Sequence, residues 1–300
     1  MQQTLNEIIS FEGSGLHTGL FIHMTVEPAD ANHGIQIARM DLDGCPVYPA
    51  VADYVSATER GTVLENGVWR VSTVEHLLSA LSAMGVDNAL IKVDAPEVPI
   101  LDGSARYYVE AIERVGLREQ EAEREVYAVS EKIEYDNGNG SHLSIVPDNN
   151  FSVEVRIGYD SPILSSQIAR VDLSADYPTE IAPARTFCFV REIEPLLDRG
   201  LIKGGNLDNA LVIYDKPISQ DKLNRLADLC HVRHIPADKL GYLSEPKYQN
   251  EAARHKLLDV IGDLALVGKP LQGRVTAEYP GHGVNTAFAK KIREIMRQNK

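Results

Sequence analysis

The sequence predicts an α+β fold made of two related halves, and three observations lead to this expectation. Each half opens with β-rich runs separated by turn-rich stretches, in residues 6–40 and again in residues 126–159. Each half then contains a helical pattern in which a histidine precedes a leucine-rich face, EHLLSAL at 75–81 and RHKLLDV at 254–260. Between the halves, residues 117–125 (LREQEAERE) are almost wholly polar and charged, which is typical of a domain boundary.

In the first half, the runs NEIISF, LFIHMTVEP and GIQIARM alternate with the turn-rich stretches GSGLHTG and ADANH, a pattern that indicates antiparallel strands. Residues 61–72 hold the turn sequence ENG between two β-rich runs, which is typical of a hairpin. Helices are expected over 73–84 and 104–116. We therefore place an N-terminal α+β domain at residues 1–120, with a hairpin insert near 58–72.

In the second half, strands are expected in VYAVSEKIEY, SHLSIVP and FSVEVRIGY, and the main helix is expected over 251–270. We place a C-terminal α+β domain at residues 125–290, with an apolar insert near 188–214 that mixes a short helix with two β-like runs. Residues 291–300 form a charged tail, either a helix or the start of a linker. Residues 215–250 are polar with three prolines and are the least predictable stretch.

Composition narrows the classes of function. The formal net charge of −13 argues against a nucleic-acid partner, because phosphate binding needs clustered Lys and Arg, but a few local cations can still hold a small anionic ligand. The chain contains no apolar run of the roughly 18 residues that a bilayer-spanning helix needs. Residues 1–20 lack the basic start and apolar core of a signal peptide, and Cys45, Cys188 and Cys230 are too scattered for a disulfide framework. A cytoplasmic protein without an integral membrane segment is expected.

The helix expected over 251–270 carries a candidate metal-binding stripe. His255, Asp259 and Asp263 recur every four residues, so they share one helix face. An imidazole and a carboxylate one turn apart can reach the same metal ion, a geometry that zinc sites use, although a solvated polar face is the commoner explanation of such a pattern in isolation. If the two halves are related, His76 faces His255 across a cleft and adds a second source of ligands.

Glu75 precedes His76, as in the tail of the H-x-x-E-H motif of metalloproteases, but Ser72 occupies the position of the first histidine. The motif H-E-x-x-H is also absent, so the sequence does not predict a peptidase. Two interpretations remain: an ordinary pair on a helix face, or a carboxylate beside a metal ligand that acts as a general base toward water.

Three further motifs have less specific interpretations. His282 is flanked by glycines in PGHGVNT, which we expect to be a loop, either a plain turn or one that exposes the histidine for chemistry. Cys230-His231-x2-His234 contains metal-ligand residue types, but it has one cysteine without a partner pair, so the end of a surface helix explains it better than a metal cluster does. The glycine-rich stretches GSGLHTG and GDLALVGKP fail as phosphate loops, because the first leads into a strand and the second lacks Gly-Lys-Ser/Thr.

Seven motifs occur in a fixed order between Gly13 and Thr286: GSGLHTG, STVEHLLSAL, VPILDGSA, ARTF, KGGNLDNA, RHKLLDVIGDLAL and PGHGVNT. In this set the chain resembles the zinc-dependent UDP-3-O-acyl-N-acetylglucosamine deacetylases of lipid A (lipopolysaccharide) biosynthesis in Gram-negative bacteria. The resemblance implies two topologically similar α+β domains, each a small mixed sheet packed on helices, with the active site between them. It also implies one insert per domain, the second lining a passage for the substrate's fatty acyl chain.

The resemblance also implies a metal site and a base. Zinc would be held by His76, His255 and Asp259, with one coordination position left open. Glu75 would be the general base that takes a proton from the attacking water. Iron can occupy a similar ligand set, so the resemblance by itself leaves the metal in the cell open.

The remaining roles are implied in the same way. His282, held protonated by Asp263, would act as general acid or stabilise the developing oxyanion. Thr186 would donate a hydrogen bond to that oxyanion, and Lys256 would contact polar or phosphate groups of the substrate. Substrate contacts are implied at four further positions: His17, Phe187, Lys203 and Gly205.

The implied reaction is hydrolysis of the 2-acetamido group of UDP-3-O-(3-hydroxyacyl)-N-acetylglucosamine, with release of acetate. The partner is then an acylated UDP-amino-sugar. Some bacterial members are fused to a 3-hydroxyacyl carrier-protein dehydratase, and residues 291–300 are a candidate remnant of such a linker. Residues 215–250 depart from the family pattern by their length.

Three other functions compete with this one. A zinc amidohydrolase for a different acylated amino-sugar would not need the apolar insert at 188–214 if its substrate were short. A silent nucleotide-sugar-binding module would not need Glu75, His282 and three metal ligands together. A scaffold with structural histidines would place apolar residues, not two glycines, around His282.

Overall fold

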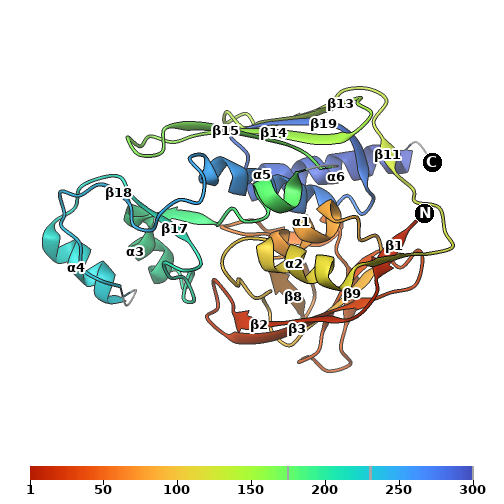
Figure 1. Ribbon diagram of the computed structural model, residues 1–300, viewed down its shortest axis with the longest axis horizontal. Coiled ribbons are helices and arrows are strands. Elements are labelled where there is room, and N and C mark those ends of the chain that lie inside the picture. Colours follow the sequence, from red (N-terminus) through yellow and green to blue (C-terminus); the bar gives the residue numbers. More distant parts are fainter. Residues whose placement is uncertain (174–175, 230–231, 299–300) are drawn as a thin grey trace.

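The computed structural model describes residues 1–173, 176–229 and 232–298, which form the α+β fold that the sequence predicts (Figure 1). The body of the molecule has four layers. A sheet from the first half lies at one side and a sheet from the second half at the other, and the helices of the two halves pack between them. The helices α1 and α5, one from each half, are in direct contact at the centre.

The first half contains a five-stranded sheet with two covering helices. In spatial order its strands are β2 (Ile9–Ser14), β3 (Phe21–Pro28), β9 (Ala89–Val93), β4 (Ile35–Arg39) and β5 (Val47–Pro49). The helices are α1 (Glu75–Ala83) and α2 (Arg106–Val115). In β3 the side chains of Ile22, Met24 and Val26 are buried and alternate with more exposed neighbours, because successive strand residues point to opposite faces.

The second half repeats this arrangement. Its sheet has the spatial order β12 (Ile133–Asp136), β13 (His142–Val146), β19 (Leu271–Glu278), β14 (Phe151–Gly158) and β15 (Ser166–Asp172), and β11 (Tyr127–Ala128) pairs with the start of β19. In both sheets the third and fourth strands in this order are parallel and the other neighbours are antiparallel. The helices α5 (Glu251–Ala265) and α6 (His282–Gln298) therefore correspond to α1 and α2.

Short elements join and extend the first half. Strand β1 (Gln3–Leu5) pairs with β10 (Leu117–Glu119), at the start of the polar stretch. A 3-10 turn, η1 (Ala52–Tyr54), leads into a small sheet of β6 (Val55–Ala57), β7 (Val63–Asn66) and β8 (Trp69–Ser72). The ENG sequence lies at the turn between β7 and β8, where Gly67 has a φ of 60°.

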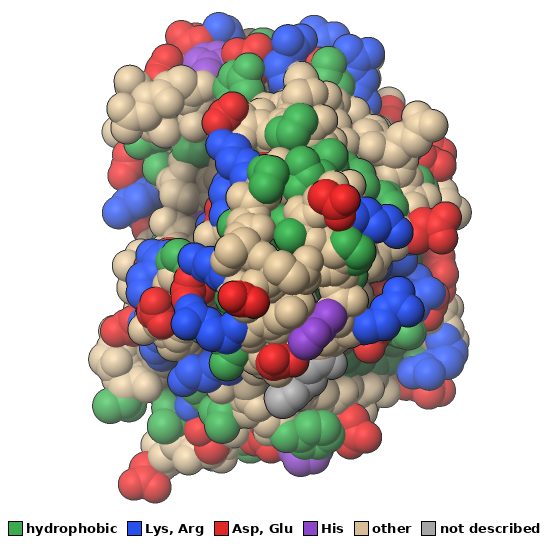
Figure 2. All heavy atoms as spheres, turned by 90° about the vertical axis from the view of Figure 1, so that its left-hand side faces the viewer, with side chains coloured by type: hydrophobic (Ala, Val, Ile, Leu, Met, Phe, Trp, Pro, Cys, Tyr) green, Lys and Arg blue, Asp and Glu red, His purple; other side chains and the backbone are tan. Residues whose placement is uncertain are grey.

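The second half carries a separate lobe, seen at the left of Figure 1. After a π-helical turn, η2 (Tyr177–Ile181), the lobe contains β16 (Phe187–Phe189), α3 (Val190–Asp198), β17 (Leu211–Tyr214), α4 (Gln220–Leu229) and β18 (Gly241–Tyr242). Its three strands form one sheet, so the lobe continues past residue 214, where we expected the insert to end. Figure 2 looks onto this lobe and shows hydrophobic side chains gathered among charged side chains of both signs.

The structure decides between two alternatives at the C-terminal end and corrects one expectation there. Residues 291–298 are helical rather than the start of a linker, because they continue α6, whose Phe288 and Ile292 are fully buried. His282 does not lie in an exposed loop, because it is the first residue of α6 and only 8% exposed. The Cys230-His231 part of the weak metal motif falls outside the described residues. No described helix is long and apolar enough to cross a membrane.

Candidate active site

The candidate site lies where the start of α1 meets the middle of α5. Gly262 permits this contact, since a Cβ atom there would lie 2.0 Å from the carbonyl oxygen of Glu75. The close approach of the two helix backbones places Glu75 and His76 of α1 beside the polar stripe of α5. The site is therefore assembled from both halves of the chain.

His76, His255 and Asp259 converge in the buried interior of this contact. Their ligand-type atoms all lie within 4.8 Å of one another, and the two imidazole rings are 5.0 Å apart and nearly perpendicular. The distance to Asp259 Oδ1 is 3.3 Å from His255 Nε2 and 4.0 Å from His76 Nε2. Within the described residues, Asp259 Oδ1 is buried without a hydrogen-bond partner, an arrangement that a bound cation would satisfy.

The protonation of these three groups suits metal binding. Burial lowers the pKa of His76 to about 3 and also lowers the pKa of His255, so both imidazoles are neutral. Burial by itself would raise the pKa of Asp259, but the charges around it, that of Lys256 first, together outweigh burial and keep this carboxyl ionised. His255 Nδ1 donates to the Ala184 carbonyl at 3.0 Å, which leaves the lone pair of Nε2 free to bind a metal ion. The donor set of two neutral imidazoles and one carboxylate fits a catalytic zinc ion.

Glu75 is the next group in the site and is 2% exposed. Its Oε2 accepts a hydrogen bond from the Thr62 backbone N–H at 3.0 Å. Burial is the main cause that raises the pKa of Glu75 to about 7, and the neighbouring carboxylates of Asp263 and Asp259 add to it against the opposing charge of His282. A carboxylate with such a pKa can accept and release a proton near neutral pH.

His282 faces Glu75 from the start of α6. Its Nδ1 donates to Asp263 Oδ2 at 3.0 Å, and its Nε2 lies 3.9 Å from Glu75 Oε1 and 3.8 Å from Asp259 Oδ2. Burial would lower the pKa of His282, but the negative charge of Asp263, followed by those of Asp259 and Glu75, raises it to about 9. His282 is therefore an imidazolium whose Nε2–H is directed into the site.

Asp263 is fully buried and is oriented by two groups that the sequence reasoning missed. Thr62 Oγ1 donates to Asp263 Oδ1 at 2.5 Å, and Asn285 Nδ2 donates to Asp263 Oδ2 at 2.9 Å. Asn285 lies within the PGHGVNT motif, one helical turn after His282, so its position could have been found from helical spacing. Thr62 carries no such signal, because it comes from the strand region of the other half.

The GSGLHTG turn is fixed by a buried carboxylate that the sequence reasoning also missed. Glu97 is fully buried, and its oxygens accept hydrogen bonds from His17 N, Thr18 N, Thr18 Oγ1 and Thr73 Oγ1 at 2.7–2.9 Å. Thr73 has a φ of 59°, a left-handed conformation that is costly for a β-branched residue. Glu97 therefore holds in place both the His17 turn and the residue that leads into α1.

His17 reaches the edge of the catalytic cluster. Its Nε2 donates to the Arg60 carbonyl at 3.2 Å, and its Nδ1 accepts from the Ile202 N–H at 3.4 Å. A Cβ atom on Gly61 would lie 3.2 Å from Glu75 Oε1 and 3.6 Å from His17 Nε2, so Gly61 lies beside both side chains. The Ile202 contact ties the turn to the lobe of the second half.

Lys256 and Phe187 lie beside the metal-ligand candidates Asp259 and His255, respectively. Lys256 Nζ pairs with Asp259 Oδ2 at 2.9 Å and lies 5.8 Å from the centre of the Phe187 ring. Burial opposes the charged form of Lys256, but the carboxylate of Asp259 raises its pKa, so the side chain stays cationic. The Phe187 ring is 6.5 Å from that of His255, which places the start of the lobe beside the metal ligands.

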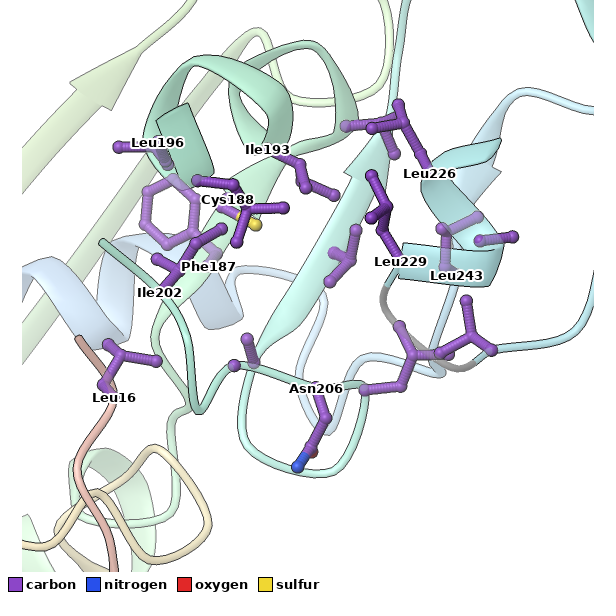
Figure 3. Close-up of a pocket in the computed structure, with 18 of the residues that line it drawn as sticks. Leu16, Phe187, Cys188, Ile193, Leu196, Ile202, Asn206, Leu226, Leu229 and Leu243 are labelled. Carbon is purple, nitrogen blue, oxygen red and sulfur yellow. The ribbon is translucent and has the colours of Figure 1, made fainter. Parts of the chain in front are cut away.

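An apolar pocket leads away from this cluster into the lobe (Figure 3). His17, Thr186, Phe187, Lys203 and Gly205 line it, so these predicted site residues are gathered along the pocket rather than among the ligands. Its deeper walls are aliphatic and come from α3, β17 and α4.

Comparison with known proteins shows the family to which this chain belongs. The model of the LpxC family, UDP-3-O-acyl N-acetylglycosamine deacetylase, matches residues 2–245 and 235–294. The chain belongs to this family. The bifunctional enzyme LpxC/FabZ of Bacteroides thetaiotaomicron is 52% identical over 99% of this chain, and that of Porphyromonas gingivalis is 52% identical over 99%.

The chain spans 65% of the length of each of these two relatives. A UDP-3-O-acyl-N-acetylglucosamine deacetylase of Myxococcus xanthus is 37% identical over 97% of this chain and 86% of its own length. The LpxC resemblance inferred from the seven motifs is thus confirmed, and the motif residues His76, Glu75, His255, Asp259 and His282 lie together in the structure.

Proposed function

We propose that this chain is a zinc-dependent amidohydrolase that removes the 2-acetyl group from UDP-3-O-(3-hydroxyacyl)-N-acetylglucosamine in lipid A biosynthesis. The observation that carries the proposal is the convergence of three buried metal-ligand side chains beside a Glu75–His282 pair. The names of the relatives support the substrate. We also propose a cytoplasmic location and a division into domains 1–120 and 125–290. Because the chain spans 65% of relatives named bifunctional enzyme LpxC/FabZ, we further propose that its natural form is fused to a second enzyme domain, for which a hydroxyacyl carrier-protein dehydratase is our candidate.

His76, His255 and Asp259 would hold the zinc ion. When bound, zinc supplies a Lewis acid that polarises the amide carbonyl and lowers the pKa of water toward neutrality. The three ligand side chains together carry one negative charge, that of Asp259, because both imidazoles are neutral. This ligand charge suits a divalent cation and still permits the approach of a neutral amide.

Glu75 would take the first proton. As the water oxygen forms a bond to the carbonyl carbon, the carboxylate of Glu75 removes a proton from that water. The Thr62 N–H hydrogen bond and the helix contact at Gly262 hold the carboxylate in place. A pKa of about 7 keeps a large share of Glu75 ionised at neutral pH while making it basic enough for this transfer.

His282 would complete the hydrolysis. Its Nε2–H is available to stabilise negative charge on the former carbonyl oxygen and then to give its proton to the nitrogen as the C–N bond breaks, which releases the amine and acetic acid. A proton passes from acetic acid to the amine, so that acetate and the ammonium form of the sugar result, and the proton that Glu75 took from water restores that of His282. Asp263 keeps Nδ1 protonated, because it accepts its hydrogen bond. Thr186 would donate a second hydrogen bond to the oxyanion, and Lys256 would contact polar groups of the substrate.

The remaining substrate contacts would lie along the pocket. His17 and Lys203 offer polar atoms at its mouth, Phe187 supplies a ring wall, and Gly205 allows close approach of the ligand to the backbone. The apolar pocket itself would take the acyl chain, which a deacetylase for short acylated amino-sugars would not require.

The test is metal content per chain combined with acetate release from the acylated UDP-sugar. We expect one zinc ion per chain, loss of turnover on chelation and recovery on adding zinc back. Metal-free protein that still releases acetate would refute the mechanism. Bound zinc without turnover on this substrate, but with turnover on another acylated amino-sugar, would favour the alternative substrate.

A further inference from the structure

Residues 215–229 and 232–243 supply one side of the apolar pocket, although nothing in the proposed catalytic roles uses them. The pocket has a cavity volume of about 140 Å³, and Leu223, Leu226, Leu229 and Leu243 line it. In Figure 3, Leu16 and Phe187 lie at one side of the pocket and Leu226, Leu229 and Leu243 at the opposite side. Because Phe187 contacts the ring of His255, the side formed by α4 is the end remote from the ligand cluster.

The helix α4 is amphipathic and turns its apolar face inward. Leu223 and Leu226 are 3% exposed and belong to a small hydrophobic core with residues of α3 and β17. On the outer face, Lys222 and Arg225 both pair with Glu194 of α3, the first at 2.7 Å. The outer charges thus hold α4 against α3 and the inner leucines against the pocket.

The rest of the segment is anchored to β17 by specific hydrogen bonds. Tyr214, which is fully buried, donates through its hydroxyl to the Ala237 carbonyl at 2.8 Å and accepts from the Ile218 N–H at 3.2 Å. The N–H of Leu243 donates to the Val212 carbonyl at 2.9 Å. Ile218 and Leu243, near the two ends of the segment, are therefore both held to β17.

We propose that α4 is the chain-length determinant of this enzyme, with Leu226 contacting the distal carbons of the substrate's acyl chain. This proposal rests on the proposed deacetylase function. The occupant is the acyl chain, because Phe187 lines the pocket with its ring 6.5 Å from that of the metal-ligand candidate His255, and the remote end of the pocket is lined mainly by aliphatic side chains. Leu226 and its neighbours on α4 then limit how many carbons the pocket accepts.

The test measures kcat/KM over a series of substrates whose acyl chains differ by two carbons. Burial of each methylene group contributes about fourfold to binding, so Leu226→Ala should raise the preference for the next longer chain by roughly tenfold. Leu226→Phe should lower kcat/KM for the longest accepted chain by about tenfold and leave shorter chains unchanged. Asp221→Ala, on the exposed face of the same helix, is the control and should keep the wild-type profile.

Two measurements separate the failure of this proposal from the failure of the proposed function. If both Leu226 variants turn over the series with the wild-type profile, the chain-length proposal is overturned and the deacetylase function stands. If the wild type hydrolyses none of the substrates, the deacetylase function fails, and binding of a series of 3-hydroxy fatty acids by calorimetry decides the role of α4. If the chain length that binds most tightly is longer for Leu226→Ala than for the wild type, the proposed role of α4 is supported. If the same chain length binds most tightly to both proteins, the role is refuted.

Discussion

Gly262→Ala is the substitution whose effect follows most directly from the structure. The new Cβ would lie 2.0 Å from the carbonyl oxygen of Glu75 and 2.8 Å from its carbonyl carbon, whereas atoms in ordinary contact are about 3.5 Å apart. Both clashing atoms belong to the backbone of α1, so no side-chain rotation relieves them. The two helices must separate by more than about 1 Å.

This separation divides the ligand set, because His76 lies on α1 while His255 and Asp259 lie on α5. Zinc coordination tolerates only about 0.2 Å of change in ligand distance, so we expect zinc affinity to fall at least about tenfold. Overpacking of this kind also costs about 1–3 kcal/mol of folding free energy.

Competition for zinc with a calibrated chelator and equilibrium unfolding of the metal-free protein measure the two effects. Gly281→Ala is a matched control, because a Cβ atom there meets nothing within 4 Å. Wild-type zinc affinity in Gly262→Ala would show that the helix contact does not set the geometry of the site.

Three other outcomes are expected. Glu75→Gln should keep its zinc and lose turnover by about 10²–10⁴-fold, measured as metal content and acetate release; undiminished turnover would exclude Glu75 as the base. Asp263→Asn removes the charge that holds the pKa of His282 near 9, so the alkaline limb of the pH–kcat/KM profile should move to lower pH, whereas a uniform decrease at every pH would contradict this role. Glu251→Gln leaves the buried Arg185 without its carboxylate partner, so it should cost about 3 kcal/mol at pH 7 by urea unfolding. Burial opposes the charged form of Glu251, but the hydrogen bond from Arg185 lowers the pKa of this carboxyl in the folded protein. The stability that the pair contributes is therefore fully present above the pKa of Glu251 in the unfolded chain, and it is lost as the pH falls through the lower pKa of the folded state. A difference in unfolding free energy between wild type and Glu251→Gln that does not change with pH would refute this assignment.

The sequence predicted the central pair of helices because the patterns that indicate them lie within short stretches of the chain. The four-residue spacing of His255, Asp259 and Asp263 survives in any straight helix, and the same His–Leu pattern marked α1. The repeated order of strands was also visible, since each strand has its own β-rich run between turn residues. These features follow from periodicity and need no knowledge of the tertiary contacts.

What the sequence did not predict depends on contacts between distant segments. Thr62 reaches Asp263 across 201 positions, and Glu97 holds the His17 turn across 80. The environment that buries His282 is created by α5 and the β7 region, whereas Pro-Gly-His by itself is typical of a turn.

The helix α4 was missed for another reason. Leu223, Leu226 and Ala227 have helical spacing, but prolines and charged residues surround them and dominate the local pattern. The apolar face of α4 is stabilised only by packing against α3 and β17, and this contact cannot be inferred from the local sequence.

The duplicated arrangement of sheets and helices has a consequence for how the molecule holds together. Neither repeat contains all three metal-ligand candidates, so an ion bound by His76, His255 and Asp259 would link the two repeats non-covalently. Its binding free energy counts toward the association of the repeats, as with any ligand that binds only the assembled state. Zinc depletion should then do more than stop the reaction: it should ease the parting of the two repeats, and amide hydrogen exchange should rise first along the α1–α5 seam.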